Sequence, residues 1–422
     1  MEYQLPYNHL TNIKIPDENI IGVFETSQKK PTTSPGNIIK KALENPIGAP
    51  RLSEVAANKK RVLILCDDHT RYTPANIILP HIIDELNRSG LNNNRIQILI
   101  ASGTHRVMTN NELITKLGKS TVDNFSVEQH LHNVSAELVP TGKIINGVQF
   151  FINRRLKDAD IIIGVGNIIP HVIKGFSGGS TIIMPGVSGG EDAIGTMHSL
   201  SLNYTIEEIL GIRNNIVRQL IDEIAREAGL NYIVNTIINN DKEILDVVAG
   251  DPIVAHQKGT EIASHVFKVN IPQKADIVIF DAYGSDLDFW QANKSLQIAY
   301  CCMKERGVII MFADCQEGIC HNIPEIRQYG FKDSKKLNEL HTKKLVSPII
   351  SHFLLAVCRI VTENGRCIVV SRGISKKDAE HVGFIHASTP QEALIKAFEI
   401  KGYDASIIIL KQAGNICPNI KE

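Results

Sequence analysis

The chain has 422 residues, of which 43% are apolar and 21% are charged, a composition typical of a globular protein with more than one domain. The formal net charge is zero, so no general basic field favours nucleic acid or an anionic membrane as a partner. The N-terminus lacks a secretory pattern and no apolar run is long enough to span a bilayer, so we expect a cytoplasmic protein.

The eight cysteines are scattered and do not resemble a disulfide framework. Cys315, Cys320 and His321 lie close together in the sequence, but their spacing matches no standard zinc pattern. We therefore expect no metal site there.

The predicted elements start after about fifty irregular, proline-containing residues that we expect to wrap the surface. Short β-branched runs then predict buried parallel strands at 62–65, 96–100, 161–163, 277–280, 308–312, 367–370 and 407–410. Helical patterns separate many of these runs. One starts near Pro74, with Thr73 as the expected N-cap, and runs to Arg88, and a longer one covers 205–228.

This alternation predicts a two-domain α/β fold with mostly parallel sheets flanked by helices. We expect an N-terminal domain over 1–272 and a C-terminal domain over 273–404. The last segment, 405–422, is a candidate to return to the first domain.

Polar and titratable side chains follow several of these strands, at the end where open α/β sheets bind ligands. Asp68, Thr70 and Arg71 lie between a strand and a helix, whose positive N-terminal end suits an anion. Arg71 can hold a carboxylate through two parallel hydrogen bonds. The alternative is that Asp68 and Thr70 only satisfy the backbone and that Arg71 is a surface charge.

His105 directly follows another buried strand, in the run Gly103-Thr104-His105-Arg106. Histidine titrates near neutrality and suits general acid/base work, although a single histidine is more often structural.

The most informative run extends from Pro170 to Ser180 and contains His171, Lys174 and Phe176 before a Ser177-Gly178-Gly179 turn. Such a turn lets backbone amides approach a ligand closely, and similar turns commonly hold phosphate. Its spacing matches neither a Walker loop nor a GxGxxG fingerprint, so neither ATP nor NAD is favoured.

Two further motifs are ambiguous on spacing alone. His198 is a possible ligand of a borderline metal such as nickel, or an ordinary polar residue. Gln291 and Lys294 are three residues apart, so on a helix they share a face that either binds a substrate or is simply solvated.

Taken in order, these pieces resemble the nickel-pincer lactate racemase family, and they cover most of the chain. The matching segments are 68–74, 103–106, 170–179, 185–187, His198 and 288–294. The resemblance implies a racemase or epimerase that inverts C2 of a 2-hydroxy acid, with its active site in the cleft between two α/β domains. It also implies a nickel-pincer nucleotide, a pyridinium-3,5-bisthiocarboxylic acid mononucleotide carrying nickel.

The resemblance assigns roles to residues. His105 and His171 match the paired acid/base histidines, and His198 matches the metal ligand. One histidine would take the hydroxyl proton while hydride leaves C2 for the cofactor, and the planar 2-keto acid would be reduced again from either face. The residues matching substrate contacts are Arg71, Trp290, Gln291 and Lys294. Those matching cofactor contacts are Asp68, Thr70, Lys174, Phe176, Ser177, Gly178, Gly179, Thr181 and Pro185.

Two positions depart from the family pattern. Thr181 stands where the founding member carries the lysine that is joined covalently to the cofactor. We therefore favour non-covalent binding, with Lys174 as the alternative tether. Trp290 stands where the family often has tyrosine, which suggests a 2-hydroxy acid other than lactate.

Two other functions stay open. A nicotinamide-dependent dehydrogenase would also transfer a hydride, but the chain lacks a GxGxxG turn after its first strand. A non-catalytic protein that binds the nickel-pincer cofactor would not need both His105 and His171.

Overall fold

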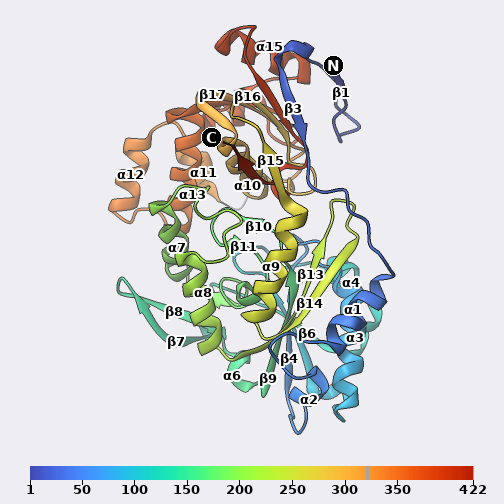
Figure 1. The fold of residues 1–422 in the computed structure, drawn as a ribbon. Helices are drawn as coiled ribbons and strands as arrows, with labels where there is room; N and C mark the ends of the chain where they lie inside the picture. Colours follow the sequence, from blue (N-terminus) through green and yellow to red (C-terminus); the bar gives the residue numbers. More distant parts are fainter. Residues whose placement is uncertain (320–322, 422) are drawn as a thin grey trace. The chain divides into compact units, whose positions relative to one another are not determined.

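The computed structural model describes residues 1–319 and 323–421 (Figure 1). Contacts divide the chain into two compact units. The N-terminal unit comprises 28–201 and 211–266, and the C-terminal unit comprises 1–27, 202–210 and the described part of 267–422. The Cys320 and His321 of the sequence analysis lie outside the described residues.

The N-terminal unit is built on a six-stranded sheet with the order β14-β13-β9-β4-β5-β6, in which only β14 runs antiparallel to its neighbour. The strands are β4 (Val62–Asp67), β5 (Ile96–Ala101), β6 (Ser126–Gln129), β9 (Ile161–Asn167), β13 (Leu230–Ile238) and β14 (Ile244–Gly250). The central strands are buried on both faces, which explains why their sequences are apolar runs rather than alternating patterns.

Helices cover this sheet on its two faces. The helices α1 (Pro35–Glu44), α2 (Leu52–Val55) and α3 (Ala75–Arg88) share one hydrophobic cluster with the central strands, and α1 and α3 lie side by side in Figure 1. The other helices are α4 (Asn110–Leu117), α5 (Lys119–Asn124), α6 (Arg155–Asp158), α7 (Glu191–Ser199), α8 (Ile216–Glu227) and α9 (Val254–Phe267). A small antiparallel sheet adds β7 (Leu138–Ile145), β8 (Val148–Asn153) and β12 (Ser188–Gly189).

The C-terminal unit has a second six-stranded sheet, entirely parallel, with the order β19-β18-β17-β16-β20-β3. The strands are β3 (Ile20–Phe24), β16 (Ala275–Asp281), β17 (Met303–Phe312), β18 (Gly365–Val370), β19 (Ile385–His386) and β20 (Ile407–Leu410). Two smaller pairs are β1 (Glu2–Tyr3) with β2 (Ile13–Lys14) and β15 (Lys268–Ile271) with β21 (Cys417–Ile420). The helices are α10 (Phe289–Cys301), α11 (Pro324–Tyr329), α12 (Ser334–Thr342), α13 (Pro348–Cys358), α14 (Lys376–Val382) and α15 (Pro390–Lys401).

The fold class expected from the sequence, a mostly parallel two-domain α/β protein, is confirmed, and each predicted strand is present. Three expectations differ from the structure. Segment 405–422 does not return to the first domain, because β20 pairs with β16 and β21 with β15. The first 27 residues also join the C-terminal unit, since β3 pairs with β20. The boundary expected after 272 lies at 267.

Two expected helix starts were wrong. Thr73 is not the N-cap of α3, because the cap position is Pro74 and the Thr73 hydroxyl instead donates to Asp67. The helix expected over 205–228 is only α8, which begins at Ile216. Gly211 adopts a positive φ that interrupts a helix, and Asn215 caps the new one by accepting a hydrogen bond from the Arg218 amide.

Candidate active site

The loops that follow β4, β5 and β9 lie at one edge of the N-terminal sheet, because these strands are parallel neighbours. A Cβ on Gly166, near the end of β9, would lie 3.5 Å from the Asp67 carboxylate and 3.6 Å from the Asn235 amide. The sheet therefore brings the predicted histidine and arginine loops of this unit to a common edge.

His105 is fixed by the carboxylate of Asp68. Its Nδ1 lies 2.6 Å from Asp68 Oδ2, and the other carboxylate oxygen accepts hydrogen bonds from the amide and hydroxyl of Thr70. Burial alone would raise the pKa of Asp68, but the charge and hydrogen bond of His105, with Arg71 and Thr70, outweigh it and hold the pKa below its ordinary value. Because this carboxylate is ionised, Nδ1 of His105 is the donor, and in the neutral ring Nε2 is the basic nitrogen.

His171 is held in the opposite way. It lies on β10 (Pro170–His171), which pairs with β11 (Gly175–Phe176), and its Nδ1 accepts a hydrogen bond of 3.1 Å from the amide of Ile173. An atom that accepts from an N–H carries no proton, so the neutral ring of His171 has its proton on Nε2. His105 and His171 are therefore held as opposite tautomers.

A buried lysine, Lys116, anchors the loop that carries Arg71, and it was not among the residues predicted for the site. Lys116 Nζ lies 2.7 Å from Asp67 Oδ1 and donates to the Arg71 carbonyl at 2.8 Å. The guanidinium of Arg71 donates to the Thr70 hydroxyl at 2.9 Å. Lys116 thus holds the backbone at Arg71, while the Arg71 side chain stays half-buried.

The Ser177-Gly178-Gly179 turn is held by three buried polar side chains that the sequence analysis also missed. Arg218 on α8 donates to the carbonyls of Phe176 and Gly178, and His256 on α9 donates to the Ser177 carbonyl at 2.9 Å. Asn235 on β13 accepts from the Gly179 amide at 2.6 Å. The signal for Arg218 was present in the sequence, because it shares a face of α8 with Ile221 and Ala225, both fully buried.

The remaining residues predicted to contact the cofactor lie beside this turn. Thr181 is on the short 3₁₀ helix Gly179–Ile182, and its hydroxyl donates to the Gly178 carbonyl at 2.9 Å. Pro185 follows a cis peptide bond, and the next carbonyl, that of Gly186, accepts from the Gly103 amide at 2.9 Å. Lys174 and Phe176 are both buried. The segment after the turn is thus hydrogen-bonded to the loop that carries His105.

His198 lies in the last turn of α7 and is half-buried. In the described ranges, 1–319 and 323–421, no group of three or more His, Cys, Asp or Glu side chains is arranged to hold a metal ion. A metal at His198 would therefore need ligands beyond those that the described residues group together.

Trp290, Gln291 and Lys294 lie on α10 of the C-terminal unit, where Asp288 caps the helix by accepting from the Gln291 amide at 3.0 Å. The Trp290 ring stacks on Phe353 with ring centroids 4.6 Å apart. All three side chains are half-buried.

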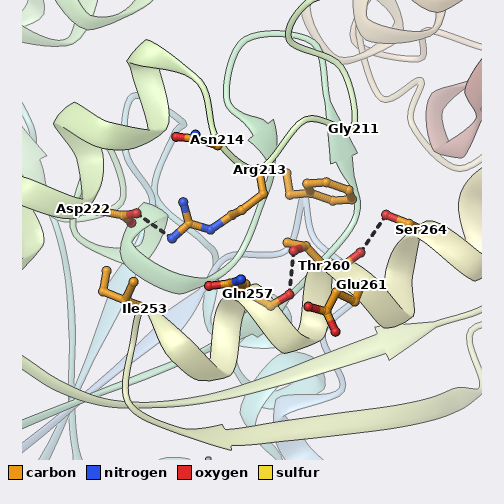
Figure 2. Close-up of a pocket in the computed structure, with 10 residues that line it drawn as sticks. Gly211, Arg213, Asn214, Asp222, Ile253, Gln257, Thr260, Glu261 and Ser264 are labelled. Carbon is orange, nitrogen blue, oxygen red and sulfur yellow. Dashed lines mark hydrogen bonds and ion pairs between the residues drawn. The ribbon is translucent and has the colours of Figure 1, made fainter. Parts of the chain in front are cut away.

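A pocket of about 550 Å³ lies within the N-terminal unit, lined by Phe176, Gly211, Arg213, Asn214, Asp222, Ile253, Gln257, Thr260, Glu261 and Ser264 (Figure 2). Of the residues predicted for the active site, only Phe176 lines this pocket. Arg213 and Asp222 form an ion pair of 2.6 Å in it, and the hydroxyls of Thr260 and Ser264 donate to carbonyls of their own helix. Its polar lining is thus largely paired internally.

Comparison with known proteins places these features in a family. The family model of the lactate racemase N-terminal domain matches residues 7–209, and that of the lactate racemase C-terminal domain matches residues 271–416. The chain is 34% identical to the lactate racemase of Thermoanaerobacterium thermosaccharolyticum over 337 residues, 78% of each chain. It is 29% identical to that of Lactiplantibacillus plantarum over 417 residues, 96% of this chain and 97% of the relative.

Solved structures agree. The lactate racemase apoprotein from Thermoanaerobacterium thermosaccharolyticum superposes with a TM-score of 0.88 over the whole of both chains, at 29% identity. A Thermotoga maritima protein has the same fold, with a TM-score of 0.74 at 21% identity over 94% of this chain and 100% of that one. Among the residues described, no helix is long and apolar enough to cross a membrane.

Proposed function

This chain belongs to the lactate racemase family and is a racemase, an enzyme of the isomerase class, and we propose that it inverts C2 of a 2-hydroxy acid with a nickel-pincer nucleotide. Lactate, the substrate named for its relatives, is the first candidate. The observation that carries the proposal is the opposite tautomers of His105 and His171.

Inversion requires one group that removes a proton on one face and another that returns a proton on the opposite face. His105, with its proton on Nδ1, offers a basic Nε2, whereas His171 offers a protonated Nε2. In the neutral state His105 can therefore take the hydroxyl proton at Nε2, while His171 can donate a hydrogen bond from Nε2 to the substrate oxygen. Arg71, Trp290, Gln291 and Lys294 are the proposed substrate-binding residues, with Arg71 holding the carboxylate.

The residues of the N-terminal unit suit such a cofactor. A Cβ on Gly178 would lie 2.9 Å from Asn235 Oδ1, and one on Gly179 would lie 2.7 Å from the His256 ring, so the turn requires glycine at both positions. The hydroxyl of Ser180 is fully buried and has no hydrogen-bond partner in the described structure. The imidazole of His198 is a suitable nickel ligand.

When bound, the pincer would supply the atom that takes the hydride from C2 and returns it. We propose that the 176–181 segment, with Pro185, Lys174, Asp68 and Thr70, contacts the nucleotide. Binding would be non-covalent, because Thr181 has no amine to form the covalent link and its hydroxyl donates to the Gly178 carbonyl. The cytoplasmic location expected from the sequence stays a prediction.

The cofactor is tested by purifying the protein from a host that makes the pincer and measuring nickel and chain mass. We expect nickel in the native protein and an unchanged chain mass after unfolding. A chain mass increased by the nucleotide would point to a tether at Lys174 instead. Protein without nickel or nucleotide would contradict the proposal and favour a nicotinamide-dependent enzyme.

The histidine roles are tested by single alanine variants of His105, His171 and His198. Loss of general acid/base catalysis costs about 100- to 10,000-fold, so H105A and H171A should lose interconversion of the lactate enantiomers on that scale while keeping nickel. H198A should lose nickel. The exposed His265 provides the control, and H265A should change neither property. Full activity in H105A and H171A would refute the acid/base roles proposed for these two histidines.

A further inference from the structure

Three successive carbonyls of the glycine turn point at buried donors. Arg218 donates to Phe176 O and, at 3.3 Å, to Gly178 O, while His256 Nε2 donates to Ser177 O at 2.9 Å. Both side chains are completely buried. We call Arg218 and His256 together the turn clamp.

Fixing a carbonyl also fixes the amide on the far side of the same peptide group, because the group is planar and its C=O and N–H point in opposite directions. The N–H of Gly178 belongs to the peptide whose carbonyl His256 holds, so it points away from α9. The N–H of Gly179 belongs to the next peptide and reaches Asn235. The clamp thus orients the Gly178 N–H, while the Ser177 N–H donates to the Ile169 carbonyl at 2.9 Å.

The clamp is supported by a second layer of side chains. Asp222 lies 4.0 Å from Arg218 and is itself paired with Arg213 at 2.6 Å, the ion pair drawn in Figure 2. The His256 ring packs against Gly179, where an added Cβ would collide with it. Burial lowers the pKa of Arg218 to about 10, so its charge persists at neutral pH beneath the turn.

His256 is neutral in this arrangement. Burial holds its pKa well below the ordinary value, and the nearby Arg218 lowers it further. Its Nε2 carries the proton that Ser177 O accepts, and its Nδ1 is buried without a hydrogen-bond partner in the described part of the chain. A protonated ring would leave a buried donor unsatisfied, so the structure favours the neutral donor tautomer.

We propose that Arg218 and His256 are positioning residues that hold the 176–179 turn in the orientation that binds the anionic nucleotide of the cofactor. Neither touches the reacting atoms; they act through the backbone of the turn. The inference rests on the proposed function for the identity of the ligand, but its structural part, a turn ordered by two buried donors, can be measured without any cofactor.

The experiment compares the removal of each donor with its conservative replacement. H256L removes the donor, whereas H256Q offers an amide N–H at a similar reach from the backbone. R218M removes the donors and charge, whereas R218K keeps the charge with a single ammonium. The measurements on the apoprotein are amide hydrogen exchange of the peptide containing 175–181 and affinity for a pyridinium-3-carboxylate mononucleotide as probe.

We expect faster exchange in the turn and about tenfold weaker probe binding in H256L, with partial recovery in H256Q, because one lost hydrogen bond is worth about that factor. R218M should accelerate amide exchange in the turn and weaken probe binding more than R218K does. Matched controls are H265L on α9 and R226M on α8, both at exposed positions, which should behave as wild type. If R218M does not fold, the His256 series still decides the question.

Unchanged turn exchange and probe affinity in the folded variants, accompanied only by a lower melting temperature, would overturn the clamp and leave a structural role. If wild-type protein neither retains nickel nor binds the mononucleotide, the proposed function fails. Faster turn exchange in H256L would then still support the ordering of the turn by His256.

Discussion

The carboxylate of Asp68 is buried, and it accepts from His105 Nδ1 and from Thr70, so it selects both the tautomer and the direction of the ring. D68N has nearly the same volume, but its amide can present either a donor or an acceptor to the ring. We expect D68N to lower kcat for enantiomer interconversion about 100-fold, the lower range for loss of positioned acid/base catalysis. Initial rates from each enantiomer would measure it.

The matched control for that substitution is D84N on α3, where the carboxylate is exposed. It should leave kcat unchanged. An unaltered kcat in D68N would show that His105 does not depend on its buried carboxylate. The sequence motif predicted Asp68 beside the cofactor, but it did not predict the contact with His105, because the two residues meet only when β4 and β5 pair.

At the scale of elements, α4 and the end of β4 are joined by one buried ion pair. Lys116 and Asp67 are mostly shielded from solvent, and the same ammonium holds the Arg71 carbonyl. K116M leaves the Asp67 charge buried without this partner, which typically costs about 3 kcal/mol. Urea unfolding should therefore show a clearly lower free energy of unfolding for K116M.

The comparison for K116M is the exposed ion pair of Lys119 with Asp123, which has a similar length of 2.9 Å. K119M should change stability by less than about 1 kcal/mol, because solvent already screens that pair. Equal effects of the two substitutions would refute the structural role assigned to Lys116.

The elements themselves were predictable to the extent that burial leaves a local pattern. Doubly buried strands such as β9 are continuous apolar runs, so each was identified from composition. The start of α8 was misplaced because 205–215 contains helix-forming residues that Gly211 and Asn215 interrupt only through backbone conformation and capping. The position of Arg218 on the buried face of α8 could have been read from the sequence, but the partners of Arg218 and His256 could not, because they are backbone carbonyls that no sequence motif marks.

For the whole molecule, the division into two units was predictable, but its boundaries were not. The chain enters the C-terminal sheet first through β3 and returns to it only after residue 266. Such long-range pairing has no local signature, because an edge strand of five residues resembles a loop segment with a few apolar side chains. Family resemblance, in contrast, was detectable because the site motifs keep their order along the chain.

Both units contain buried histidines that make stability depend on pH. Burial lowers the pKa of His130 in the N-terminal unit and of His352 in the C-terminal unit to about 4. Between that value and about 6.5, the pKa of an unperturbed histidine, the unfolded chain binds more protons than the folded chain. Their contribution to stability is therefore present above about pH 6.5 and is lost as the pH falls toward 4.

Asp281 acts in the opposite direction, because burial raises its pKa to about 6 and the folded chain keeps a proton that the unfolded chain loses. Between pH 7 and pH 5, each histidine lowers the free energy of unfolding by roughly 2 kcal/mol, whereas Asp281 raises it by somewhat less. The histidines therefore decide whether the protein is less stable at pH 5. We expect a lower urea midpoint at pH 5 than at pH 7. H352L should reduce that difference and the exposed H265L should not, whereas a midpoint that is equal or higher at pH 5 would show that the buried histidines do not control the acid stability of the protein.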